Sequence, residues 1–454
     1  MKKIKLKPKA LKKLPKSSIR IVHPNAAGID IGSESHFVSV PPDRSDESIR
    51  EYRCFTADLK EMVNFLKECR IDTVAIESTG VYWIPLHEII EANGIEVFLV
   101  NASHLKNVPG KKDDAADSDW IRELHTFGLL RSSFVPQSDI REIRDYWRLR
   151  DRHIRAASRE INHIQKALDL MNLHLHKVIS DITGKTGMSI IESILKGERD
   201  PQKLAKYRDK RIKSSEEEIA LSLEGNYSDA RLFELSQALD LYKFYHQKIV
   251  DCDEQLEKHL ARFEKKTEAS PPPSKKRKKK AQGNAPKFDV QSYLYQIFGV
   301  DLTKIDGISS QTALTIFSEV GADFSRFKNE KHFASWMGLS PNKKISGGKT
   351  LSSKTKKVKN RIAIALRVAA STLTRNSSAL GQFYRRMRFK HGPSKALTAT
   401  ARKMACLIYR MVTHGHEYLD IGSVKYEQKI HDHQVKFIKK RAKQLGFQLT
   451  EIVT

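Results

Sequence analysis

The sequence predicts an α/β amino-terminal domain, a long coiled-coil helical hairpin and a mainly α carboxyl-terminal domain. Between Ala27 and about Leu130, short β-rich runs alternate with helical runs. From about Ile140 apolar residues recur every seven positions, and helical patterns return after a segment rich in proline and lysine. A chain of 454 residues is long enough for two or three domains, since single cores rarely grow beyond about 300 residues.

The first region, residues 23–136, follows a basic arm at residues 1–22 that holds nine Lys or Arg residues. Its β-rich runs are GIDIGSESHFVSV, EYRCF, TVAI and VFLV, and LKEMVNFLKEC and PLHEIIEANG are the helical runs between them. Such alternation predicts a sheet of several short strands covered by helices.

The second region, residues 137–264, holds two apolar stripes of period seven. The first stripe is Ile140, Ile143, Trp147, Ile154, Ala157, Ile161, Ile164, Leu168 and Met171, and the second is Leu232, Leu235, Leu239, Tyr242, Ile249, Leu256, Leu260 and Phe263. Arg150 breaks the first stripe, and His246 and Asp253 break the second. The pattern predicts two long helices, paired either within one chain or between protomers.

A linker without a core is predicted at residues 265–287, which contain three consecutive prolines and a run of lysine and arginine. Residues 288–420 form the third region, and 421–454 form a carboxyl-terminal tail. Within the third region, KIDGISSQTALTIFSEVG is similar to a helix-hairpin-helix, with Ser309 where that motif usually has its second glycine. A plain helical turn at Gly307 is the alternative.

The charge of the chain indicates a polyanionic partner. Its formal net charge is +27, and residues 331–416 contain 19 Lys or Arg and no Asp or Glu. Four scattered cysteines indicate neither a zinc site nor a disulfide framework, and neither a membrane span nor a signal peptide is predicted. A cytoplasmic protein that binds nucleic acid is therefore expected.

Four carboxylates are candidate catalytic and metal-binding residues. Asp30 lies within a predicted strand, and Glu77 ends the strand TVAIE. Asp114 and Asp117 are three residues apart in the acidic stretch KKDDAADSDW and so share one helix face. Together the four could hold two Mg²⁺ ions beside a phosphodiester. Alternatively, acidic residues such as Asp114 simply favour the positive end of a helix dipole, and Asp113 and Asp119 are expected on the solvated face.

Six segments, in the same order, resemble the DEDD transposases of the insertion-sequence one-ten family, and most closely its eleven-eleven subgroup. They are GIDIG, AIESTGVYW, NASHLKNVPGKKDDAADSDWI, IDGISSQTAL, FASWMGLSPNKKISGGK and ALTATARKM. The resemblance implies an RNase H-like, resolvase-like first domain with Mg²⁺ at Asp30, Glu77, Asp114 and Asp117. This chain has Lys-Asp-Asp before the helix where the family usually has Lys-Thr-Asp.

The resemblance also implies a serine nucleophile, which maps onto Ser346 in KKISGGK. It implies donor and target DNA as partners, a noncoding bridge RNA, a phosphoserine intermediate and a prokaryotic, nucleoid-associated protein; a homo-oligomer, either a dimer or a tetramer, is expected as well. Tyr384 is a rival nucleophile, but it does not match the family position. A junction-resolving nuclease that uses water and a noncatalytic nucleic-acid-binding protein are alternative functions.

Overall fold

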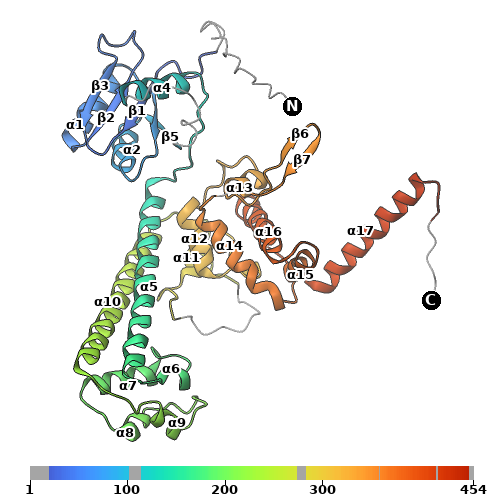
Figure 1. Ribbon diagram of the computed structural model, residues 1–454. Coiled ribbons are helices and arrows are strands. Elements are labelled where there is room, and N and C mark those ends of the chain that lie inside the picture. The colour runs from blue at the N-terminus through green and yellow to red at the C-terminus, as the bar shows by residue number, and fades with distance from the viewer. Residues whose placement is uncertain (1–19, 102–113, 273–282, 357, 416–417, 449–454) are drawn as a thin grey trace, which may run out of the picture. The chain divides into compact units, whose positions relative to one another are not determined.

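The computed structural model describes residues 20–101, 114–272, 283–356, 358–415 and 418–448 (Figure 1). The chain divides between Val135 and Pro136 into two compact units, here called unit 1 and unit 2. Asp113, the basic arm up to residue 19 and residues 273–282 of the linker lie outside the described residues. Of the helices described, none is long and apolar enough to cross a membrane.

Unit 1 is built on a five-stranded mixed sheet in the order β3-β2-β1-β4-β5. The strands are β1 (Ala26–Ile31), β2 (Ser35–Ser39), β3 (Ile49–Arg53), β4 (Thr73–Glu77) and β5 (Glu96–Val100). β1, β2 and β3 are antiparallel neighbours, whereas β4 runs parallel to β1 and β5 runs parallel to β4. The parallel connections pass through α1 (Thr56–Glu68) and α2 (Trp83–Ala92), because a parallel crossover needs a long connection. This arrangement confirms the predicted α/β domain.

The two faces of the sheet are covered by different helices (Figure 1). Alternate strand residues such as Ile29, Val74 and Ile76 are fully buried against α1 and α2. The opposite face carries Gly28, Asp30, Ala75 and Glu77 and is covered by α4 (Asp114–Thr126). As expected, the neighbours of Asp30 in the strand are buried on the face opposite to it.

Unit 2 begins with two long helices that pack along each other, α5 (Ser138–Leu170) and α10 (Asp229–Leu260) (Figure 1). α5 has 33 residues and is therefore about 50 Å long. Four short helices connect the pair and bury their own apolar cluster against it. They are α6 (Leu175–Val178), α7 (Lys185–Leu195), α8 (Pro201–Ala205) and α9 (Glu216–Leu221). The two stripes of period seven thus meet within one chain.

Two of the three predicted breaks in the stripes, Arg150 and Asp253, face each other. Arg150 is 1% exposed and Asp253 is 3% exposed, and Arg150 Nε donates a hydrogen bond to Asp253 Oδ1 at 2.5 Å. Arg150 also donates to the carbonyl of Asn284, and the backbone N–H of Lys287 donates to Asp253. These two interruptions are therefore a buried ion pair, and the carboxyl-terminal end of the predicted linker is hydrogen-bonded to it.

The rest of unit 2 is mainly helical. Its elements are α11 (Val290–Phe298), η2 (Leu302–Lys304), α12 (Ser310–Val320), α13 (Glu330–Trp336), β6 (Lys344–Ser346), β7 (Lys349–Ser352), α14 (Arg361–Ser371), η3 (Thr372–Arg375), α15 (Ala379–His391), α16 (Pro393–His414) and α17 (Gly422–Gln444). Polar side chains that accept hydrogen bonds from backbone N–H groups begin several of these helices; they are Asp289, Ser309, Asn329, Asn360 and Ser378. α17 has no buried residue.

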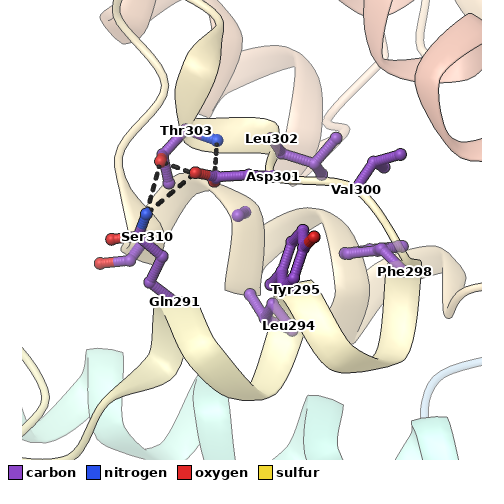
Figure 2. Close-up of a pocket in the computed structure, with 10 residues that line it drawn as sticks. Gln291, Leu294, Tyr295, Phe298, Val300, Asp301, Leu302, Thr303 and Ser310 are labelled. Atoms are coloured by element: carbon purple, nitrogen blue, oxygen red, sulfur yellow. Dashed lines mark hydrogen bonds between the residues drawn. The ribbon is translucent and has the colours of Figure 1, made fainter. Parts of the chain in front are cut away.

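The segment that is similar to a helix-hairpin-helix, residues 304–321, runs from the end of η2 to the end of α12. Gly307 has φ +87°, a conformation that favours glycine, and Ser309 caps the amino end of α12. Ahead of this turn, Figure 2 shows Gln291 of α11 donating hydrogen bonds to Asp301 and Thr303 at η2. The cavity beside them is about 10 Å³, room for one water molecule at most. These side chains hold η2 to α11, and the role of residues 304–321 as a helix-hairpin-helix stays a prediction.

Candidate active site

Asp30 and Glu77 lie at the carboxyl ends of two adjacent parallel strands. Ile29 pairs with Ile76 in the register of β1 and β4, so the next residue of each strand brings Asp30 beside Glu77 on one face of the sheet. Both residues are half-buried. This edge is where α/β sheets usually present functional groups.

α4 adds two more carboxylates over the same face. Asp114 and Asp117 stand in its first turn, and both are exposed. A Cβ atom at Gly28 would collide with the backbone of α4, at the carbonyl oxygen of Ser118 and the amide nitrogen of Arg122. Because Gly28 has no side chain, α4 can lie directly on β1. The helix thereby carries its acidic first turn toward Asp30, two residues further along the strand.

The electrostatics of Asp30 show that the other three carboxylates act on it. Burial raises the pKa of Asp30, and the charges of Asp114, Glu77 and Asp117 raise it further, to about 6 from an ordinary value of 3.8. A hydrogen bond from the backbone N–H of Ile31 opposes this rise. Sequence positions 30, 77, 114 and 117 therefore form one charged cluster.

The chemistry of this cluster fits a hard divalent cation. All four donors are carboxylate oxygens, which Mg²⁺ prefers, and a cation would relieve the repulsion that raises the pKa of Asp30. Within the described ranges, however, no three His, Cys, Asp or Glu side chains are already grouped closely enough to hold a metal ion.

Ser346 lies at the tip of a small exposed hairpin in unit 2. It is the last residue of β6 and pairs with Lys349, the first residue of β7. Gly347 and Gly348 make the two-residue turn, with φ values of +54° and +75°, as expected of a type I′ hairpin turn. Tyr384, the rival nucleophile, is only 4% exposed. The burial of this residue argues against Tyr384 as the nucleophile.

Comparison with known proteins finds two transposase domains in the chain. A family model described as a transposase, of the DEDD IS110 type, matches residues 27–173. A second model, described as Transposase IS116/IS110/IS902 family, matches residues 301–385. The chain carries the two transposase domains of the IS110 family. No curated protein matches the chain.

The two matches include all the predicted site residues of the transposase. Asp30, Glu77, Asp114 and Asp117 fall in the first match and Ser346 in the second. The family is one of DNA-cleaving enzymes, and its DEDD type uses a divalent metal. The mixed sheet of unit 1 is consistent with an RNase H-like transposase domain.

The sequence interpretation of Asp119 needs a correction. Asp119 is not simply solvated, since it accepts hydrogen bonds from the Ser39 hydroxyl at 2.8 Å and from Arg122 Nε at 3.0 Å. Arg122 Nε also donates to Ser39, which lies on β2, and Arg122 is 9% exposed. This network ties α4 to the sheet just beyond the acidic turn. A glycine within a predicted strand, Gly28 in GIDIG, can indicate such a close helix contact from the sequence. No residue near Ser39 in the sequence indicates its contact with Asp119 and Arg122.

Proposed function

We propose that the transposase is a site-specific DNA recombinase that cleaves and rejoins strands through a phosphoserine intermediate. The observation that carries this proposal is the clustering of Asp30, Glu77, Asp114 and Asp117 at the carboxyl end of the sheet. An exposed serine flanked by lysines, Ser346, supplies a nucleophile in the second matched domain.

The four carboxylates would hold Mg²⁺. When bound, Mg²⁺ stabilises the negative charge that develops on the attacked phosphate and on the leaving oxygen. Asp30 and Glu77 are half-buried on two neighbouring parallel strands, so the sheet fixes two of the ligands. The first turn of α4, which covers this face of the sheet, supplies Asp114 and Asp117. The contact at Gly28 and the Asp119–Arg122–Ser39 network keep α4 in place.

Ser346 performs the covalent step. Its Oγ forms a bond to phosphorus while one P–O bond of the DNA strand breaks, and the serine proton ends on the released deoxyribose hydroxyl. The phosphoserine ester replaces a phosphodiester, so the reverse attack by a new DNA hydroxyl rejoins the strand without nucleotide fuel. The flanking residues Lys344 and Lys349 are exposed and carry the positive charge that attracts the phosphate.

A noncoding bridge RNA and an oligomer of two or four chains complete the proposal. The segment at residues 331–416 contains 19 Lys or Arg and no Asp or Glu. This is more positive charge than the phosphates of one short DNA contact would neutralise, which supports the binding of RNA in addition to DNA. α10 exposes Phe233, Leu241 and Phe244 on its outer surface, which supports contact with another copy.

A junction-resolving nuclease is the second candidate function. It is favoured by one observation, that all four carboxylates belong to unit 1 and need no residue of unit 2. In that mechanism water attacks the phosphodiester, and Ser346 has no part in the chemistry.

Substitution of the exposed carboxylates tests the acidic site. Asp114→Asn and Asp117→Asn are each expected to reduce DNA cleavage by about a hundredfold to a thousandfold, the scale of losing one electrostatic stabiliser of the transition state. DNA affinity should change by less than about threefold, because the basic surface is intact. Cleavage rates and filter binding on the same DNA measure the activity and the affinity. Removal of Mg²⁺ with EDTA should lower the cleavage rate of wild type to a similar extent.

Glu96→Gln is the matched control, since Glu96 is an exposed carboxylate at the amino end of β5. The candidate site lies at the carboxyl ends of the parallel strands. It should cleave at the wild-type rate. Full cleavage by wild type in EDTA, or by both Asn variants, would contradict the proposed role of the carboxylates.

A further inference from the structure

The turn between α15 and α16 presents an unusually exposed aromatic side chain. Phe389 stands in the last turn of α15 and is 93% exposed. Arg388, Lys390 and His391 beside it are also exposed, as is Lys395 in the first turn of α16. A lone exposed apolar residue is ordinary on a protein surface. An almost bare phenyl ring set among four basic side chains is a different feature.

The basic side chains of α15 divide into two groups. Arg385 donates to the carbonyl of Asn376 and to Gln382, and Arg386 bonds to Tyr426 of α17. These two hold α15 in the fold. Across the described ranges, Arg388 and Lys390 make no side-chain hydrogen bond or ion pair, and the sequence has no acidic residue from position 331 to 416. Their charges therefore face solvent or a partner.

The space beside the turn is open. Gly392 has φ +80°, and a Cβ atom placed on it would meet nothing within 4 Å. α16 begins at Pro393 and continues for 22 residues, so the positive end of its dipole is at this turn. An exposed aromatic ring, cations with no partner among the described residues and a helix amino end thus share one exposed turn, and a negatively charged partner with flat apolar faces would match all of them.

We propose that the α15–α16 turn is a DNA wedge, in which Phe389 stacks on a base of an unpaired or kinked strand while Arg388, Lys390 and Lys395 contact the flanking phosphates. Proteins that distort DNA insert apolar side chains between base steps, and aromatic rings stack on exposed bases. A protein partner fits less well, since the centre of a protein interface is depleted of charge. The proposal rests on DNA as the substrate and is independent of Ser346 and of the carboxylates.

A fluorescent base analogue tests the wedge. The probe is a duplex with a nick beside one 2-aminopurine, and the full chain binds it in EDTA so that cleavage plays no part. Wild type should change the 2-aminopurine fluorescence on binding. Phe389→Ala should abolish that change and weaken binding about tenfold, a typical effect of losing one stacked base. Phe389→Trp should keep both, because indole also stacks.

Two further variants separate stacking from charge and from general surface effects. Lys390→Gln should keep the fluorescence change but lower the slope of log affinity against log salt by about one. Phe55→Ala removes a phenyl ring that is 61% exposed just before α1 and should behave as wild type. Equal affinity and equal fluorescence for Phe389→Ala and wild type would overturn the proposal. So would a loss that affects an RNA strand of the same sequence but not the DNA.

Discussion

At the scale of single residues, Asp30 shows how a functional site opposes stability. Its strand neighbours Ile29 and Ile31 are buried in the core, while Asp30 itself is half-buried beside three other carboxylates. The folded chain therefore holds an ionised group in a place that raises its pKa to about 6. Such a position is understandable if a cation neutralises the cluster during function.

Asp30→Asn is expected to stabilise the metal-free protein. A carboxyl whose pKa is raised on folding destabilises the folded state when ionised, above about pH 6, and this penalty disappears as the pH falls towards 3.8. After a discount for solvent screening at this half-exposed position, the gain in the free energy of unfolding in EDTA near neutral pH is about 1 kcal/mol.

Urea unfolding in EDTA at several pH values measures this difference. The gain should vanish near about pH 4 and should shrink or reverse when Mg²⁺ is added, since Mg²⁺ stabilises only the protein that binds it. A metal-free wild type that is more stable than Asp30→Asn at neutral pH would show that the cluster is not under electrostatic strain.

At the scale of elements, the helix pair α5 and α10 shows what a sequence pattern can and cannot reveal. The apolar stripes predicted two long helices, and both exist. The polar interruptions at Arg150 and Asp253 carry no visible relation in the sequence, because they are 103 residues apart. Only the packed structure shows that they neutralise each other, and that the carboxyl-terminal end of the predicted linker adds hydrogen bonds to the pair.

Removal of one partner of this buried pair should be strongly destabilising. Asp253→Ala leaves the Arg150 guanidinium buried without a counter-ion, and we expect a loss of about 3 to 5 kcal/mol in the free energy of unfolding. The double variant Arg150→Met with Asp253→Leu should recover most of that loss, because both charges are gone.

Chemical denaturation followed by circular dichroism provides the measurement. Asp251→Ala is the control, since Asp251 is about half exposed and pairs with Lys248 on the surface of α10. It should cost less than about 1 kcal/mol. If Asp253→Ala and Asp251→Ala cost the same, the buried pair does not hold α5 and α10 in register.

At the scale of the whole molecule, the sequence predicted chemistry more fully than geometry. The alternation of runs predicted the α/β domain, and residue types pointed to Asp30, Glu77, Asp114 and Asp117. Strand order, the register that places Asp30 beside Glu77, and the contact of α4 with Gly28 depend on residues far apart in the chain. The exposure of Phe389 likewise depends on tertiary packing. The sequence around it predicts a helix but does not indicate which of its side chains remain exposed.

The division of labour between the two matched domains is the central claim. One domain carries the carboxylates and the other carries Ser346, and the proposed reaction needs both. A DNA strand that stays attached to protein after cleavage distinguishes this reaction from hydrolysis, because the attacking oxygen then belongs to the chain rather than to water.

The most direct test is to trap this covalent adduct. A DNA substrate with a nick that prevents rejoining is incubated with the full chain and Mg²⁺, and the products are separated under denaturing conditions. Wild type and Ser353→Ala, a control at an exposed serine just beyond the same hairpin, should form a protein–DNA adduct that maps to Ser346. Ser346→Ala and wild type in EDTA should form none. Free DNA ends without an adduct, produced equally by wild type and Ser346→Ala, would contradict the serine mechanism and favour a nuclease that uses water.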